Sequence, residues 1–203
     1  MRKMIVAGGA LLVAGVCGAV VAGARLEPPS WLNSDMDKGM QAWEESAKLG
    51  EPHEYLGKSL GEYDVVMRMW MDPSGAPMES KGTAKRYWKI EGRWLMEDLK
   101  GEVMGQPYQG FGITGWDNTR KQFVTTWSDN MSTSLMVARG SISADMKTMT
   151  MIGEMDEPMT GEIGKAVMYK SIEKSPDVQV FQAYEILYGE PVKVMEIEYT
   201  RKK

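Results

Sequence analysis

Residues 84–99 decide the fold, and they read Ala84-Lys85-Arg86-Tyr87-Trp88-Lys89-Ile90-Glu91-Gly92-Arg93-Trp94-Leu95-Met96-Glu97-Asp98-Leu99. Two runs rich in aromatic residues flank Glu91-Gly92, and a glycine in a two-residue loop is typical of a β-hairpin. If Glu91-Gly92 is that loop, Arg86 faces Glu97 and Trp88 faces Leu95 on one mostly apolar surface. We therefore expect this surface to face the interior of a folded sheet.

The opposite surface of the same hairpin pairs Lys85 with Asp98 and Tyr87 with Met96, and we expect it to face solvent. The ion pair on the interior surface fits this register, because a buried charge must be paired or hydrogen-bonded.

A second hairpin is predicted near the C-terminus, with Gly189-Glu190 as its turn. This turn pairs Tyr184 with Met195 and Gln182 with Ile197 on the more apolar surface.

Between residues 61 and 201 the chain forms about ten short strand-like runs separated by turn residues. The first run contains Tyr63, Val65, Met67, Met69 and Met71, and the other predicted strands cover residues 79–90, 93–104, 107–116, 120–129, 132–142, 146–155, 162–174, 177–188 and 191–201. So many antiparallel strands with short connections remove their edges best by closing on themselves. The sequence predicts an all-β fold, an antiparallel meander barrel of about ten strands preceded by one or two short α-helices.

The N-terminus has the features of an export signal. Arg2 and Lys3 precede an uncharged stretch, residues 4–24, which ends in a small-x-small cleavage motif. We expect residues 1–24 to be a signal peptide, so that the exported protein is periplasmic or extracellular. If they are not cleaved, residues 4–24 are long enough to anchor the chain in a membrane. Cleavage would remove Cys17, the only cysteine.

The rest of the chain divides into three predicted parts. Residues 25–33 form a linker, residues 34–60 a helical segment, and residues 61–203 the barrel. Ser34 is the expected N-cap of the first helix, and Pro52 is expected to follow its end.

The composition excludes several classes of function. The net charge of −4 gives no basic surface for nucleic acid. His53 is the only histidine, so a two-histidine metal site is excluded, as is any His-based pair of catalytic residues. No phosphate-binding loop, dinucleotide fingerprint or nucleophile elbow is present. We expect no catalytic residues, no metal site and no cofactor, and a membrane contact only through an uncleaved N-terminal segment.

From His53 onward the chain resembles the family known as domain of unknown function 1579. The resemblance rests on residues 53–56 (His-Glu-Tyr-Leu), 61–63 (Gly-Glu-Tyr), 110–118 (Gly-Phe-Gly-Ile-Thr-Gly-Trp-Asp-Asn), 126–133 (Thr-Trp-Ser-Asp-Asn-Met-Ser-Thr), 156–161 (Asp-Glu-Pro-Met-Thr-Gly) and 194–201 (Val-Met-Glu-Ile-Glu-Tyr-Thr-Arg). It implies bacterial origin and a calycin-type barrel similar to lipocalins and fatty-acid-binding proteins. It brings no catalytic residues.

The leading functional hypothesis is that the barrel binds a small apolar or amphipathic ligand. An inward arginine can hold an anionic headgroup by paired hydrogen bonds, and aromatic rings line many small-molecule pockets. The candidate ligand-binding residues are Arg86, Glu97, Trp88 and Trp127. Arg86 and Glu97 also suit a structural ion pair that fixes register, and the tryptophans also suit core packing.

Three alternative functions stay open. The first is an envelope scaffold with a solid core, and the second is an enzyme that acts on a small molecule without histidine. The third is Cu(I) binding by methionine thioethers, which are soft ligands. Of the 19 methionines, 17 lie beyond residue 24, and Met67, Met69 and Met71 would share one strand face.

Overall fold

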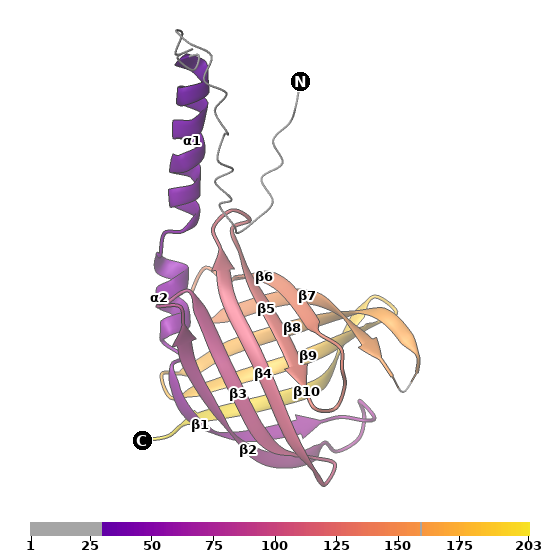
Figure 1. The fold of residues 1–203 in the computed structure, drawn as a ribbon. Helices are drawn as coiled ribbons and strands as arrows, with labels where there is room; N and C mark the ends of the chain where they lie inside the picture. The colour runs from indigo at the N-terminus through magenta and orange to yellow at the C-terminus, as the bar shows by residue number, and fades with distance from the viewer. Residues whose placement is uncertain (1–29, 159) are drawn as a thin grey trace. The chain divides into compact units, whose positions relative to one another are not determined.

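The structure is a computed structural model that describes residues 30–158 and 160–203. Ten antiparallel strands form a closed barrel in which each strand pairs with the next and β1 pairs with β10 (Figure 1). The elements are α1 (Ser30–Ser46), α2 (Glu51–Gly57), β1 (Gly61–Met69), β2 (Met78–Lys89), β3 (Trp94–Val103), β4 (Gln106–Asp117), β5 (Gln122–Asp129), β6 (Met136–Ile142), β7 (Thr148–Glu157), β8 (Glu162–Ser175), β9 (Val178–Leu187) and β10 (Glu190–Arg201). The predicted fold class is confirmed.

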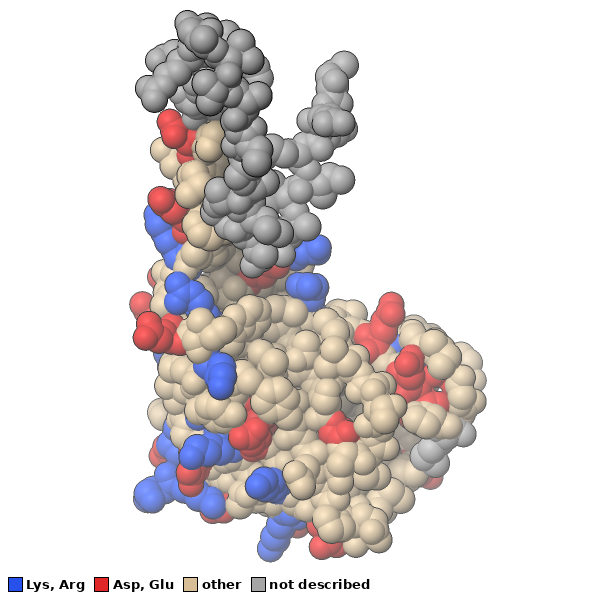
Figure 2. All heavy atoms as spheres, in the orientation of Figure 1, with Lys and Arg blue, Asp and Glu red and all other residues tan. Residues whose placement is uncertain are grey.

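Alternation of side chains separates the inside of the barrel from the outside. In β1, Tyr63, Val65 and Met67 are buried, while the residues between them are more exposed. Burying side chains of this size stabilises the fold by about 1.5–3 kcal/mol each. Charged side chains lie on the outer surface of the barrel, many of them near its margins (Figure 2).

The register predicted for the first hairpin is confirmed. Arg86 pairs with Glu97 and Trp88 with Leu95 across β2 and β3. The φ angles of Ile90, Glu91 and Gly92 are 57°, 37° and 77°, and the Arg93 N–H donates to the Ile90 carbonyl oxygen over 3.1 Å. Positive φ values at Glu91 and Gly92 are typical of a type I′ turn, whose twist matches that of the flanking strands, and Ile90 adopts a positive φ as well.

The turn predicted for the last hairpin is wrong by one residue, and the predicted pairing is wrong with it. Its turn is Tyr188-Gly189, with φ angles of 53° and 85°, so Leu187 pairs with Glu190. A bulge between Lys193 and Met195 then shifts the pairing again. As a result Met195 pairs with Ala183 instead of Tyr184.

The same shift moves other residues to new positions. Ile197 pairs with Phe181, and Gln182 pairs with Glu196. The Gln182 side chain donates to Glu196 over 2.9 Å and accepts from the Tyr184 hydroxyl over 2.7 Å. Gln182 and Tyr184 therefore belong to the outer wall, where this polar chain of contacts lies, and not to the interior.

The helical segment has two helices, but their bounds differ from the prediction. Helix α1 begins at Ser30, four residues before the expected N-cap Ser34. Pro52 does not terminate a helix, because it lies in the first turn of α2, where its missing N–H costs nothing. The Gly50 N–H donates to Nδ1 of His53 over 3.1 Å, so the only histidine caps α2.

Helix α2 closes one end of the barrel. Leu56 is buried in the same apolar cluster as Leu95 and Phe123, and the Tyr55 ring meets the Phe123 ring edge-on at 5.9 Å. The chain divides into a unit up to Met40 and a unit from Gln41 onward, and α2 and the barrel belong to the second.

The predicted signal peptide cannot be compared with the structure, whose described residues begin at residue 30. The predicted signal peptide, residues 1–24, lies outside the described residues. In residues 30–158 and 160–203, no helix is both long and apolar enough to cross a membrane.

Strand β1 ends at Met69, so Met71 follows the strand and is exposed instead of extending one face with Met67.

Glycine at position 140 is required by the close approach of β6 and β7. A Cβ atom there would overlap the carbonyl oxygen of Thr150, which is backbone and cannot move aside. We expect Gly140→Ala to lower the free energy of unfolding by about 1–3 kcal/mol, the usual cost of overpacking. Urea denaturation followed by tryptophan fluorescence measures this change.

The matched control is Gly39→Ala in α1, where an added Cβ meets nothing within 4 Å. This change should leave the barrel's denaturation midpoint unaltered, since alanine is also the better helix former. A Gly140→Ala protein with the wild-type midpoint would contradict the steric argument.

Candidate functional site

Three of the four predicted site residues lie in one row across the inner wall. Arg86 of β2 pairs with Glu97 of β3, Glu97 with Gly112 of β4, and Gly112 with Trp127 of β5. Residues in direct register across antiparallel strands point to the same face. Trp88 lies two residues further along β2, towards α2.

Arg86 is the centre of a polar cluster that joins strands on both sides of β1. Its Nε donates to Oε2 of Glu97 over 2.6 Å, and its Nη1 donates to Oε1 of Gln179 in β9 over 2.5 Å. The Tyr199 hydroxyl of β10 donates to the second oxygen of Glu97 over 2.8 Å. Both carboxylate oxygens of Glu97 therefore accept a hydrogen bond.

Two tyrosine rings enclose the guanidinium. Its Cζ lies 4.2 Å from the centre of the Tyr199 ring and 5.1 Å from that of Tyr63. Arg86 is only 9% exposed, and the Glu97 side chain 15%. A cation over an aromatic face is stabilised further when water is excluded.

Burial and pairing act in opposite directions on the pKa of Arg86. Burial is the largest single effect and would lower it, but the charge and hydrogen bond of Glu97 together with Tyr199 and Tyr63 outweigh burial, and the pKa of Arg86 is raised above its usual value. The pKa of Tyr199 is raised well above its usual value, first by burial and then by Glu97. The cluster therefore holds a charged arginine next to neutral tyrosines at neutral pH.

Trp127 belongs to a second polar cluster. Its indole Nε1 lies 3.1 Å from the hydroxyl of Tyr108 and 3.1 Å from Oδ2 of Asp129, and the Tyr108 hydroxyl donates to the same carboxylate. A Cβ on Gly110 or Gly112 would overlap the indole ring. Two glycines of β4 thus leave the space in which this ring lies flat against the wall.

Trp88 lies apart from the others, near the end that α2 closes. It is half-buried and packs against the apolar cluster that contains Leu56. A Cβ on Gly57 would be 3.4 Å from its ring. The position of Trp88 thus suits helix packing as well as pocket lining.

Sequence reasoning missed three members of the two clusters: Gln179, Tyr199 and Tyr108. Gln179 of β9 and Tyr199 of β10 contact Arg86 only because the barrel closes, since both strands are far from β2 in sequence. The correct register of the last hairpin pairs Tyr199 with Gln179. That register would have placed both residues on one face.

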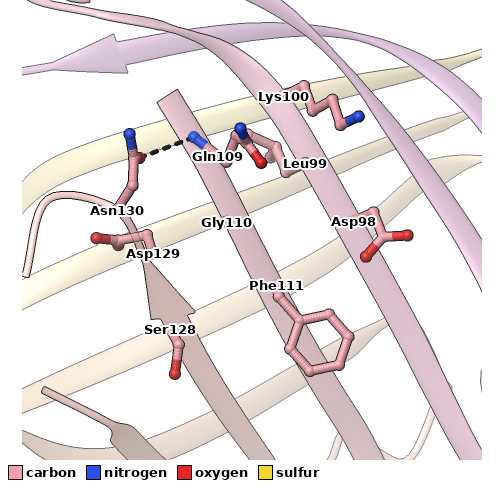
Figure 3. A pocket seen from close by; sticks show the side chains of 9 residues that line it. All are labelled: Asp98, Leu99, Lys100, Gln109, Gly110, Phe111, Ser128, Asp129 and Asn130. Atoms are coloured by element: carbon pink, nitrogen blue, oxygen red, sulfur yellow. Dashed lines mark hydrogen bonds between the residues drawn. The ribbon is translucent and has the colours of Figure 1, made fainter. Parts of the chain in front are cut away.

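A hollow of about 380 Å³ lies elsewhere, on the outer wall across β3, β4 and the end of β5. Figure 3 shows its lining, with Asp98, Phe111 and Ser128 pointing away from the sheet and Asn130 accepting a hydrogen bond from the Gln109 N–H. No group of three or more histidine, cysteine, aspartate or glutamate side chains that could hold a metal occurs in residues 30–158 and 160–203.

The fold and its inner polar clusters define a closed antiparallel ten-strand barrel with aromatic and charged residues inside. The chain belongs to a family described as "Protein of unknown function (DUF1579)", whose model matches residues 48–201. This confirms the family resemblance of the sequence.

Two solved structures are similar to the barrel. Rv2717c from M. tuberculosis is 15% identical, with a TM-score of 0.51, and the match covers 77% of this chain and all of that one. A redesigned beta barrel is 13% identical, with a TM-score of 0.39 and the same coverage. No curated protein matches the chain. The likeness to Rv2717c supports the fold alone.

The buried ion pair leads to a stability prediction. Glu97→Gln should lower the free energy of unfolding by about 3–5 kcal/mol, because it leaves the charge of Arg86 buried without a counter-charge. Arg86→Met and Glu97→Gln together should cost less than the sum of the two single changes, Arg86→Met and Glu97→Gln. Urea denaturation of the four proteins measures the coupling.

The exposed pair Lys85–Glu62, at 3.5 Å, is the control. Lys85→Met should change stability by less than about 1 kcal/mol. Additive effects of the Arg86 and Glu97 changes would show that the two side chains do not stabilise each other.

Buried tyrosines predict a loss of stability at high pH. Burial raises the pKa of Tyr169 from 10.0 to about 12, and burial with the charge of Glu173 does the same for Tyr55. The folded state holds these protons more tightly than the unfolded state. The resulting stability is fully present below pH 10 and is lost as the pH rises towards 12.

Urea denaturation at several pH values between about 9 and 12 measures this loss. Tyr169→Phe should make the pH dependence shallower, because the ring remains and the ionisable hydroxyl is gone. Tyr188→Phe, at a fully exposed position, is the matched control and should leave the dependence unchanged. Equal slopes in all three proteins would contradict the prediction.

Proposed function

We propose that the protein binds a small apolar or amphipathic molecule inside the barrel. One observation carries the proposal, namely that two inward-facing aromatic side chains are only half-buried. Phe181 lies between Ser171 of β8 and Ile197 of β10, and it remains half-buried, as does Trp127. Side chains at such positions in a solid core are packed on all sides. Their half-burial supports an interior with room beside the rings.

The side chains around this interior space suit contact with apolar ligands of different shapes. The Phe181 ring stacks on Tyr169 at 5.6 Å. Met69, Met136 and Met195 are half-buried and pack at the edge of the core clusters. Methionine adapts its shape to irregular partners, and aromatic rings supply large apolar faces.

The polar end of the ligand would meet the cluster around Arg86 and Glu97. A guanidinium carries five N–H donors in a fixed plane, and the two contacts to Glu97 and Gln179 use two of them. Arg86 would hold the polar end, while Trp127 and Trp88 would line the apolar part. Because Glu97 compensates the charge of Arg86, a neutral polar group suits this position as well as an anionic one.

The ligand would enter at the end opposite α2. Leu56 of α2 is buried at the closed end. At the other end β1 finishes at Met69 and β6 begins at Met136, and both side chains are half-buried. This arrangement resembles that of the lipocalins and fatty-acid-binding proteins, as the family resemblance implies.

A scaffold with a solid core is the second candidate. The observation in its favour is the saturation of Glu97, whose two oxygens bind Arg86 and Tyr199, while Gln179 takes a further donor of the arginine. A cluster satisfied to this extent also suits a purely structural role.

We also propose, from the sequence alone, that residues 1–24 export the protein, that residues 25–33 link this signal to the rest, and that the mature protein is periplasmic or extracellular. N-terminal sequencing of the protein from its host measures this directly. A mature protein that begins at residue 1 and stays in the cytoplasm would contradict it.

Binding of the fluorescent fatty acid parinarate tests the interior site. The wild-type protein should bind it with one-to-one stoichiometry, and Trp127→Ala should weaken binding about tenfold, because a large buried contact face is lost. Tyr188→Ala, at the surface, is the control and should bind like the wild type.

Native mass spectrometry of protein purified from its host complements this titration, since a bound apolar molecule would add mass. A protein that neither binds parinarate nor carries added mass would favour the solid scaffold. Equal affinity of the wild-type and Trp127→Ala proteins would place the ligand elsewhere.

A further inference from the structure

A larger hollow, of about 680 Å³, lies on the outer wall of the barrel, and we call it the outer groove. Two rows of cross-strand neighbours form its floor and one side. The first row runs through Trp94, Gly115, Val124 and Arg139, and the second through Met96, Ile113 and Thr126. Volumes of about 300–1,000 Å³ are typical of small-molecule sites.

The floor of the outer groove is apolar, although it faces away from the barrel interior. The outward surface of the β2–β3 hairpin was expected to be in solvent, yet Met96 is only 8% exposed. A Cβ on Gly115 would overlap the ring of Trp94, so the indole lies flat across β4. Ile113 and Val124 complete a flat apolar surface.

Cationic side chains outnumber anionic ones around this floor. Arg139 and Lys89 line the groove, and Asp117 is its one acidic lining residue in the described part of the chain. Oδ1 of Asp117 already accepts hydrogen bonds from the backbone N–H groups of Thr119 and Arg120. The lining therefore has one uncompensated positive charge.

Arg139 has a donor without a partner. Its Nη1 is buried and makes no hydrogen bond within residues 30–158 and 160–203. It forms an ion pair with Oδ2 of Asp117 at 3.9 Å, which is beyond hydrogen-bonding distance. A buried donor left unpaired is costly, and the Arg139 side chain as a whole is 40% exposed, so its charge is accessible from the groove that it lines.

One rim of the groove is fixed in place. The Asn118 side chain donates to the carbonyl oxygens of Ser46 and Lys48 over 3.2 and 2.7 Å. Its own oxygen accepts from Nε1 of Trp116 over 3.0 Å. The loop that follows β4 is thus held against the segment that precedes α2, so the rim exists before any ligand arrives.

We propose that the outer groove is a second binding site, which takes a small molecule with a flat apolar body and a carboxylate group. The apolar body lies on Trp94, Met96 and Ile113. The carboxylate binds the guanidinium of Arg139, whose planar donors match carboxylate geometry. This site is separate from the barrel interior, and its occupancy does not depend on the interior site.

Titration with naphthoate, monitored by NMR, tests the proposal. Naphthoate should shift the Trp94 indole N–H and the Met96 methyl signals, and naphthylmethanol, which lacks the charge, should bind about tenfold more weakly. Arg139→Gln should weaken naphthoate binding about tenfold and leave naphthylmethanol unchanged. Arg139 is about 40% exposed on its side chain, so the variant is expected to fold.

Arg68→Gln, on the outer face of β1, is the matched control and should bind naphthoate like the wild type. Thr126→Asp places a negative charge on the floor and should weaken naphthoate far more than naphthylmethanol, which supports the site even if Arg139→Gln unfolds. Trp127→Ala should leave naphthoate binding unaltered, because that change tests the interior alone. Shifts confined to Phe181 and Trp127, equal binding of the acid and the alcohol, or no binding would overturn the proposal.

Discussion

The pairing of β1 with β10 is the constraint on which the rest of the structure depends. Seven residue pairs, from Tyr63 with Arg201 to Met69 with Met195, join the first strand to the last. Without them two strands would expose unpaired backbone groups, a ready template for association with other chains. Closure also creates an inside, and every inward residue must then either fill that space or line it.

Arg86 shows what closure requires of a charged residue. The sequence supplies its first partner locally, since Glu97 lies across a two-residue turn. Its other contacts, to Gln179 and to the rings of Tyr63 and Tyr199, come from β9, β1 and β10. These additional contacts of Arg86 connect β2 with β1, β9 and β10, and they exist only in the closed barrel. A cluster of this kind fixes register as well as charge balance.

The sequence was sufficient for the barrel and for the first hairpin, because Glu91-Gly92 offers a single good two-residue turn and alternation then assigns each side chain to a face. It was not sufficient for the last hairpin. Gly189 can occupy either central position of a turn, and the bulge at Val194 leaves no mark in the alternation of residues. A shift of one residue moves every side chain to the other face, so Gln182 was assigned to the interior and Gln179 was missed.

The alternation of side chains predicts which face a residue lies on, but it does not predict whether the outer face is apolar or solvated. It correctly placed Met96 opposite Tyr87, but it implied a solvated surface there. The hollow depends on Gly115, which lets the Trp94 ring lie across β4, and on the rim that Asn118 fixes. These contacts connect β3, β4 and the loop after β4 with a segment before the barrel, so no local pattern predicts them. The barrel wall thus has an apolar surface on each side at β3 and β4. Inside, Glu97 compensates the charge of Arg86 at hydrogen-bonding distance. Outside, Arg139 and Asp117 form an ion pair at 3.9 Å without a direct hydrogen bond, and it is this looser pairing on which the proposed binding of a ligand anion rests.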